Sequence, residues 1–389
     1  MDITPWTAKT NDITFKYDDI IHKFGVTPID QNLIQQFETV TNSKAHKWLK
    51  RGIFFAHQDM NLLLDNYQKG NQFYLYTGRG PSSSSADGQN GMHIGHLIPF
   101  QFTKYLQDAF NAPLVVQMSD DEKFYFKDIE LDEVYKNTFE NAKDIIACGL
   151  NSDKTFIFSN LDYMGYMYKN VVKLDKLITC NQIKGIFGLN LTGDNSCNIG
   201  QAGWATKQAA PCFCDSFPHL FGKRKDVQCM IPCAIDQSPY FRMVRDYSDK
   251  LGYKKPALIY SQFLVSLAGS NQKMSSSDTG QYTIFLTDTP EIIREKVTKH
   301  AFSGGKQTLK EHREFGANLE IDVPYQYLRI LLDDDILLDK ITHDYGHGIM
   351  LTKDVKNILI DELTKMILNH QLERSKVDQS VLDTFFEIK

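Results

Sequence analysis

Two histidines three residues apart, His93 and His96, follow a glycine-rich loop whose residues 77–82 read Thr-Gly-Arg-Gly-Pro-Ser. The apolar run at residues 73–76 predicts a strand before the loop, and the residues from His93 onward predict a helix after it. A strand, a glycine turn and a helix N-terminus in this order form an anion site, because free backbone N–H groups and the helix dipole face the loop. The imidazole N–H groups could then donate to phosphate oxygens and to charge that develops during a reaction. Taken alone, the pair would more simply be two half-exposed helix histidines.

A second candidate lies about 180 residues downstream, where residues 272–278 read Gln-Lys-Met-Ser-Ser-Ser-Asp. Lys273 stands at the front of this serine-rich loop. An ammonium group acts as a compact point charge for phosphate, so a lysine here could follow a departing pyrophosphate. By itself the run is an ordinary polar loop. Its position downstream of the histidine pair on the first helix of the α/β pattern is what favours a functional role.

Together, these two motifs resemble the HIGH and KMSKS motifs of class I aminoacyl-tRNA synthetases, in the order in which that class carries them. Further runs are similar to the eukaryotic-type tryptophanyl-tRNA synthetases, and they separate this family from the sister tyrosyl enzymes. These runs span residues 74–82, 117–123, 141–149, 231–237 and 301–305. The resemblance covers most of the chain from about residue 50.

The resemblance implies a two-step ligase. ATP activates L-tryptophan to an adenylate with Mg²⁺ present, and the amino acid then passes to the 3′ end of tRNA(Trp). The expected catalytic groups are His93, His96, Arg79 and Lys273, and no protein side chain is expected to ligate a metal. The expected ATP-binding residues are Gly78, Arg79, Gly80, His93, Gly95, His96, Ile231, Ala234, Lys273, Met274, Ser275 and Ser276.

A tryptophan site needs aromatic walls for the indole and an acceptor for its N–H. The residues that match the family positions for this task are Tyr76, Gln117, Glu122, Gln208 and Gln237. Glu122 belongs to an acidic run that could equally be a solvated charge cluster. Its position after a buried strand favours a role in binding, because open α/β sheets bind ligands at the carboxyl ends of their strands.

The elements that must position these residues alternate between strand and helix. Strands are predicted at residues 73–76, 114–118, 155–158, 227–231 and 257–260, with helices between them, including one that ends at a C-cap on Gly149. This pattern predicts an α/β fold, a Rossmann-type doubly wound parallel sheet, followed by an all-helical C-terminal domain.

We expect three domains. Residues 1–70 form a mostly helical segment without obvious chemistry, 71–285 the catalytic domain and 286–375 an anticodon-binding domain, while a helix at about 376–389 packs back on the catalytic domain. The sequence departs from the family pattern at one place. The loop at residues 84–91 carries extra polar residues, so we expect it to extend further over the site.

The 389 residues carry 43 Lys and Arg against 48 Asp and Glu, a net charge of −5, which excludes a uniformly basic nucleic-acid binder. Residues 294–313 nevertheless form a locally basic stretch, although such a run is more often a solvated face. No apolar run is long enough for a membrane span, and the first residues lack a leader pattern, so we expect a cytoplasmic protein. The resemblance also implies a homodimer.

Seven cysteines, an odd number, fit reduced thiols. Cys212, Cys214, Cys229 and Cys233, with His219 between them, could in principle bind zinc. Their spacing favours buried free thiols instead.

Two other functions stay open at this point. A small nucleotidyltransferase also carries a His-x-Gly-His motif, although it would not need the helical C-terminal part. A synthetase-like binding protein without catalysis is the second, and the two intact motifs argue against it.

Overall fold

The computed structural model describes residues 2–3, 8–82, 91–193, 196–274 and 280–388. Ser275, Ser276 and all but the last residue of the polar loop at 84–91 lie outside the described residues. Within the described ranges, no helix is both long and apolar enough to cross a membrane.

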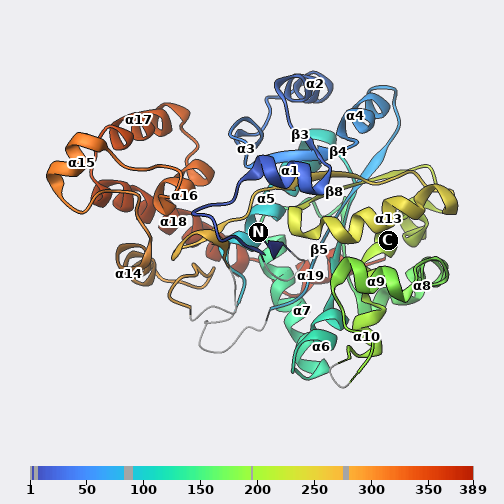
Figure 1. The fold of residues 1–389 in the computed structure, drawn as a ribbon. Helices are drawn as coiled ribbons and strands as arrows, with labels where there is room; N and C mark the ends of the chain where they lie inside the picture. The colour runs from blue at the N-terminus through green and yellow to red at the C-terminus, as the bar shows by residue number, and fades with distance from the viewer. Residues whose placement is uncertain (1, 4–7, 83–90, 194–195, 275–279, 389) are drawn as a thin grey trace.

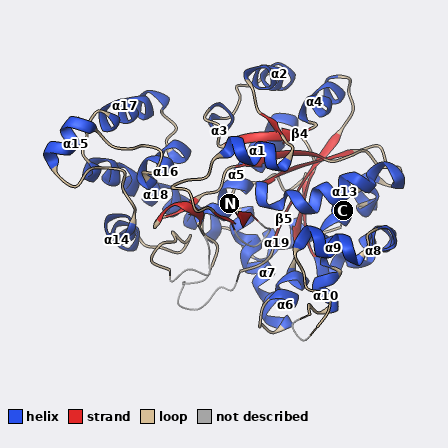
Figure 2. Cartoon of the chain, viewed as in Figure 1, coloured by secondary structure: helices blue, strands red, loops and turns tan. Residues whose placement is uncertain are grey.

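A seven-stranded sheet forms the centre of the molecule, with the strand order β3-β4-β9-β8-β5-β6-β7 (Figure 2). The strands are β3 (Thr27–Pro28), β4 (Phe54–Gln58), β5 (Phe73–Arg79), β6 (Leu114–Met118), β7 (Thr155–Ser159), β8 (Gln228–Ala234) and β9 (Ala257–Ser261). Strands β9, β8, β5, β6 and β7 are parallel, and β4 and β3 join one edge antiparallel. Every residue of β6 is buried, as expected for a strand with helices on both faces. The α/β prediction is therefore confirmed.

Helices cover both faces of this sheet, and two apolar cores separate it from them. On one face pack α4 (Met60–Gln68), α5 (Ile94–Phe110) and α7 (Leu131–Ile146). On the other pack α1 (Tyr17–Phe24), α8 (Asn160–Leu177), α9 (Cys180–Phe187), α11 (Trp204–Ala209) and α13 (Ser238–Leu251). The shorter helices α2 (Gln31–Thr41), α3 (Lys47–Lys50), α6 (Asp120–Phe126), α10 (Ile199–Ala202) and α12 (Pro218–Phe221) lie between these elements. The two-sided cover makes this a doubly wound sheet.

The C-terminal part is helical, as predicted, and lies to one side of the sheet (Figure 1). Its helices are α14 (Pro290–His300), α15 (Leu309–Phe315), α16 (Val323–Leu331), α17 (Asp335–Gly346) and α18 (Thr352–Ser375). The last helix, α19 (Gln379–Phe386), returns to the sheet, where the rings of Phe386 and Phe139 lie 5.1 Å apart between centroids.

The first 70 residues contribute strands as well as the predicted helices. β4 is a full member of the central sheet. A second, smaller sheet has the order β1-β2-β11-β10, formed by β1 (Asp2–Ile3), β2 (Ala8–Lys9), β10 (Val265–Ser266) and β11 (Gly269–Lys273). In it, Lys9 pairs with Gln272, directly beside Lys273. The N-terminal segment thus pairs with the strand that carries the predicted catalytic lysine.

The predicted C-cap at Gly149 was wrong. Helix α7 ends at Ile146 with Ala147 as its C-cap, and Gly149 follows with φ +84°. Its left-handed backbone conformation explains the glycine, but Gly149 lies three residues past the last residue of the helix.

Side chains of α3 bind the carboxyl end of α16, and we call this contact the α3–α16 junction. Lys47, Trp48 and Arg51 donate to backbone carbonyl oxygens of residues 329–332 over 2.7 to 3.1 Å. Arg51 also forms an ion pair with Asp335 at 2.5 Å. The last carbonyls of a helix have no partner within the helix, and cations are favoured there. The junction therefore holds the N-terminal segment against the helical part.

Candidate active site

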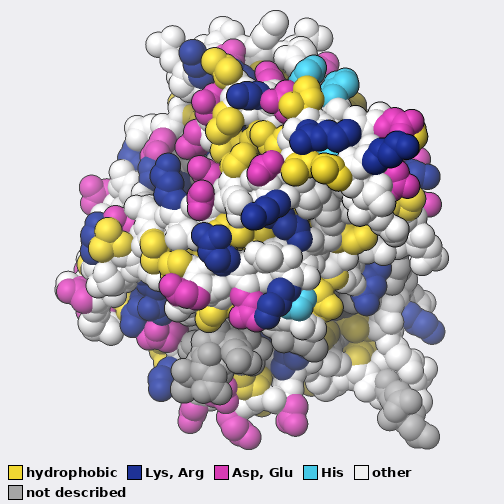
Figure 3. Space-filling view, turned by 90° about the vertical axis from the view of Figure 1, so that its left-hand side faces the viewer, with side chains coloured by type: hydrophobic (Ala, Val, Ile, Leu, Met, Phe, Trp, Pro, Cys, Tyr) yellow, Lys and Arg dark blue, Asp and Glu magenta, His cyan; other side chains and the backbone are white. Residues whose placement is uncertain are grey.

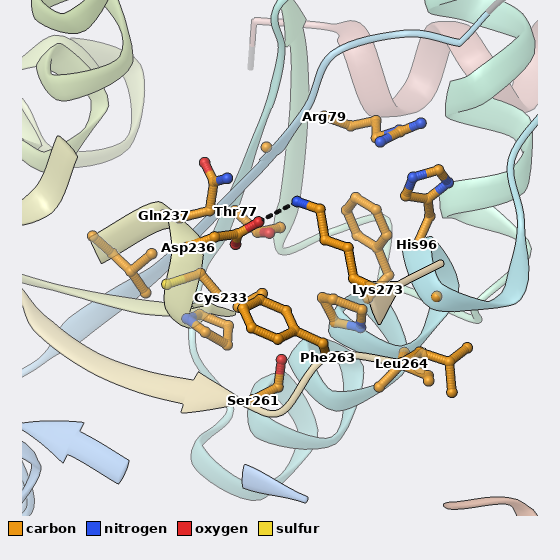
Figure 4. Close-up of a pocket in the computed structure, with 18 of the residues that line it drawn as sticks. Thr77, Arg79, His96, Cys233, Asp236, Gln237, Ser261, Phe263, Leu264 and Lys273 are labelled. Carbon is orange, nitrogen blue, oxygen red and sulfur yellow. Dashed lines mark hydrogen bonds and ion pairs between the residues drawn. The ribbon is translucent and has the colours of Figure 1, made fainter. Parts of the chain in front are cut away.

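A cavity of about 290 Å³ opens at the carboxyl ends of β5 and β8 (Figure 4). The chain runs from β5 to β6 on one side of the sheet, whereas β8 and β9 lie on the other side of β5. Such a switch point leaves a crevice between diverging connections, which is where open α/β sheets bind ligands. Among the predicted residues, those that line the cavity are Tyr76, Gly78, Arg79, His93, Gly95, His96, Gln208, Ile231, Ala234, Gln237, Lys273 and Met274.

The two histidines meet at the start of α5. His93 is the N-cap residue, and its backbone N–H donates to Nδ1 of His96 at 3.2 Å. Their rings stack with centroids 3.4 Å apart. Burial holds the pKa of both imidazoles well below the ordinary value, and the charge of Arg79 adds to this effect. Both rings are therefore neutral at pH 7, and since Nδ1 of His96 accepts, its Nε2 carries the proton.

Buried polar atoms without a protein partner concentrate around this cavity. They include both ring nitrogens of His93, Nε of Arg79 and Oδ1 of Asp236. A buried donor or acceptor that stays unpaired costs free energy, so such a group in a cavity wall indicates where a polar ligand binds. Burial lowers the pKa of Arg79 to about 10, which still leaves it cationic at pH 7.

Lys273 reaches the cavity from the end of β11, and its Nζ lies 2.5 Å from Oδ2 of Asp236 (Figure 4). Asp236 is 4% exposed and sits in the short 3₁₀ helix (Ile235–Gln237) that follows β8. Asp236 was not among the predicted site residues. Its signal was its position directly before Gln237, at the carboxyl end of a predicted strand.

The predicted tryptophan residues divide into two groups. Tyr76, Gln208 and Gln237 line the cavity, whereas Gln117 and Glu122 are not among its lining residues. The hydroxyl of Tyr76 donates to Oε1 of Gln117 at 2.6 Å and lies 3.0 Å from the carbonyl oxygen of Gln208. Gln117 therefore fixes the orientation of a residue that does face the cavity.

Glu122 lies in the first turn of α6, directly after β6, and accepts a hydrogen bond from Ser119 Oγ at 2.8 Å. Burial raises its pKa, as it does for a carboxyl group that loses water. Gly80 does not line the cavity, but it lies against Glu122: a Cβ there would come within 3.0 Å of Oε2 and 2.8 Å of Lys123 Cε. A side chain at this position would therefore require the ends of Glu122 and Lys123 to shift.

Two further acids of this run are buried rather than solvated. Asp120 accepts from the Ser159 hydroxyl, and Asp121 accepts from Asn160 Nδ2 at 2.8 Å. Asn160 in turn accepts from Gln117 Nε2 at 2.9 Å. Burial raises the pKa of Asp120 to about 6. This network fixes the side chain of Gln117, and no sequence motif indicated Asn160.

Cys212, Cys214, Cys229 and Cys233 are buried free thiols, as predicted. Burial raises the pKa of the Cys214 thiol to about 11, so it stays protonated. Across the ranges that the structure describes, no group of three or more His, Cys, Asp or Glu side chains could hold a metal ion.

The chain is similar in sequence and in structure to known tRNA synthetases. Residues 223–379 match the family model described as tRNA synthetases class I (W and Y). The chain is 52% identical to the cytoplasmic tryptophan–tRNA ligase of Homo sapiens, with 98% of this chain and 80% of the relative covered. It is 48% identical to the cytoplasmic tryptophan–tRNA ligase of Dictyostelium discoideum, covering 100% of this chain and 95% of the relative. The crystal structure of Plasmodium falciparum tryptophanyl-tRNA synthetase matches with a TM-score of 0.87 at 46% identity, covering 96% and 95% of the two chains.

Proposed function

The chain belongs to the tryptophan–tRNA ligase family of class I tRNA synthetases, and from this premise we propose how its cavity performs the reaction of the family. The chain activates L-tryptophan with ATP and transfers it to tRNA(Trp). One observation carries the assignment of the site: unpartnered N–H groups of His93 and Arg79 face one cavity together with Lys273, at the switch point of the sheet. These groups suit a ligand rich in anionic oxygens.

In the first step, a carboxylate oxygen of tryptophan attacks the α-phosphorus of ATP. The new O–P bond gives the mixed anhydride, and the bond to the β-phosphate oxygen breaks to release pyrophosphate. His93 and His96 act as neutral donors to the oxygens of the α-phosphate, while Arg79 and Lys273 supply positive charge as the pyrophosphate leaves. Backbone groups from Ile231 to Ala234 flank the adenine, with Gly78 and Gly95 giving close backbone approach.

Mg²⁺ enters as part of the ATP substrate, held by phosphate oxygens and water. Mg²⁺ is commonly bound in this way by nucleotide enzymes, with few protein ligands. Gly80, Met274, Ser275 and Ser276 complete the ATP-binding set that we propose.

Tryptophan binds with its indole beside Tyr76 and with its amino and carboxylate groups toward Gln208 and Gln237. We assign Glu122 as the acceptor for the indole N–H and Gln117 as the residue that orients Tyr76. Phenylalanine has no N–H group, so its binding would leave the buried acceptor unpaired. The free-energy cost of that unpaired acceptor discriminates strongly against phenylalanine.

In the second step, a terminal ribose hydroxyl of the tRNA attacks the carbonyl carbon of the adenylate and AMP departs. Within the three domains proposed, 1–70, 71–285 and 286–375, the last binds the anticodon. Figure 3 faces this helical part: Lys and Arg side chains spread over the middle of the face among acidic and apolar ones. Positive charge that is local rather than uniform fits the recognition of one RNA.

We propose a cytoplasmic homodimer. The relatives carry the word cytoplasmic in their names. The support for self-association is a group of large apolar side chains left exposed on α8 and α9, namely Tyr166, Tyr168, Val172 and Ile186. Large apolar side chains on the surface are available to be covered by a second copy of the chain.

The test is amino-acid-dependent exchange of labelled pyrophosphate into ATP by the full-length chain without tRNA. We expect exchange with tryptophan and none with tyrosine. Exchange that needs another acceptor would favour the nucleotidyltransferase function, and no exchange with any amino acid would favour a binding protein.

A further inference from the structure

The lysine proposed to follow the pyrophosphate sits on a short two-stranded hairpin. Strands β10 and β11 are antiparallel, and Val265 is the residue directly opposite Lys273. The hairpin has only two residues on one side and five on the other. A pair of strands this small is marginal alone, so its position depends on what binds it from outside.

A tyrosine from the helical part binds the hairpin at that residue. Tyr327 lies in α16, and its side chain is completely buried. Its hydroxyl donates to the carbonyl oxygen of Val265 at 2.7 Å. Phenylalanine would fill the same apolar space without a hydroxyl, so the contribution special to tyrosine is this one hydrogen bond.

The hairpin is bound at a second point to the same helix. The carbonyl oxygen of Leu267 accepts from the backbone N–H of Phe302 at 2.8 Å, and the carbonyl oxygen of Phe302 accepts from the N–H of Val323 at 3.1 Å. Val323 is the first residue of α16. The other end of α16 is fixed in the α3–α16 junction. The helix is therefore a rigid support on which the hairpin rests.

We propose that Tyr327 is a positioning residue for Lys273. By fixing the carbonyl of the residue opposite Lys273, it sets the position of that end of β11 along the cavity wall, and with it the reach of the ammonium group. Misplacement of a charged group by a fraction of an ångström weakens its interaction with the transition state more than with the bound substrates. This inference rests on the proposed function, in which Lys273 contacts the triphosphate.

The test compares Tyr327→Phe with a matched control on the same helix. The hydroxyl of Tyr325 lies 2.8 Å from Thr342 Oγ1, entirely within the helical part, so Tyr325→Phe also removes one hydroxyl from α16. In tryptophan-dependent exchange, we expect kcat to fall roughly tenfold for Tyr327→Phe, with the KM for tryptophan changed less than about twofold. We expect no change in kcat for Tyr325→Phe. Equal kcat in the two variants would overturn the proposal.

A double-mutant cycle with Lys273→Met separates positioning from general loss of structure. If Tyr327 acts through Lys273, adding Tyr327→Phe to Lys273→Met causes no further loss of kcat. The same fractional loss in both backgrounds would overturn the proposal, because it would show a structural effect independent of the lysine. The wild-type chain tests the proposed function separately. If wild-type exchange is normal but Tyr327→Phe causes the same fractional loss of kcat in both backgrounds, only the positioning role of Tyr327 is refuted. If the wild type shows no exchange, the proposed function and the positioning role are both refuted.

Discussion

The active-site cavity and the α3–α16 junction both concentrate polar and charged side chains, but they differ in how these groups are paired. At the junction, Lys47, Trp48 and Arg51 all donate to carbonyl oxygens of one helix end. In the cavity, His93 and Arg79 keep buried nitrogen atoms without a protein partner. Paired groups stabilise the fold, whereas unpaired ones in a cavity wall lower stability and are retained for a ligand. Lys273 is paired with Asp236, so what distinguishes the cavity from the junction is the set of buried nitrogen atoms that keep no protein partner.

The largest effect is expected in the cavity, for Lys273→Met. The rate of adenylate formation should fall about 10²- to 10³-fold, because a charge aimed at the departing pyrophosphate is lost. Pre-steady-state adenylate formation and tryptophan binding are measured together, with Lys255→Met, at an exposed ion pair, as the control. Equal losses in rate and in tryptophan affinity would contradict the role in the transition state.

At the α3–α16 junction, Arg51→Met should lower stability and leave activity nearly unchanged. We expect the free energy of unfolding to fall by about 2 kcal/mol, because two carbonyl oxygens lose a charged donor, while exchange activity changes less than about twofold. Urea denaturation measures the first quantity. Arg224→Met, which removes an exposed pair with Asp226, should leave stability nearly unchanged. A large loss of activity at constant stability would make the junction part of the site.

Glu122→Gln tests the proposed indole acceptor in the first turn of α6. The ratio of kcat/KM for tryptophan over phenylalanine should fall about tenfold, because the neutral amide is a weaker acceptor for the indole N–H. Glu133→Gln, on the exposed surface of α7, is the control. If discrimination is unchanged, Glu122 is not the indole acceptor.

The smallest effect concerns Asp120, which is buried and paired yet still titrates. Its folded pKa of about 6 lies above the ordinary value near 3.8. The raised pKa means that the folded state favours the protonated form, so the stability from this group is complete below pH 3.8 and is lost as the pH rises through 6. Between pH 5 and pH 8, the wild type should lose about 1 kcal/mol of unfolding free energy relative to Asp120→Asn. Parallel stability profiles for the two proteins would show that Asp120 does not titrate in this range.

The sequence predicted most of the central sheet, because short apolar runs such as residues 114–118 have few other stable environments. It failed for β4, whose short apolar run does not distinguish a strand from a buried helix. The end of α7 was misplaced because a left-handed glycine indicates a turn without fixing how far it lies from the last helical residue.

The motifs predicted the site residues that line the cavity from β5, α5, β8 and β11. The motifs could not show that Gln117 binds the hydroxyl of Tyr76 and does not line the cavity. Which of these two positions a residue takes depends on the packing of β6 against β5. The ion pair of Asp236 with Lys273 and the contact of Tyr327 with Val265 join segments distant in the chain. No local pattern in one sequence records such a pairing.

The α3–α16 junction also constrains how the molecule is made. Lys47 and its partner Asp333 are 286 residues apart in the chain. A ribosome that adds roughly 5–20 residues per second needs about 15 to 60 s to deliver the second partner after the first. During that interval, the apolar face of Trp48 and the cations beside it are exposed without the helix end that they bind. The nascent chain therefore passes through a long period in which its N-terminal segment is open to chaperones, and the junction forms only after the end of α16 has been synthesised.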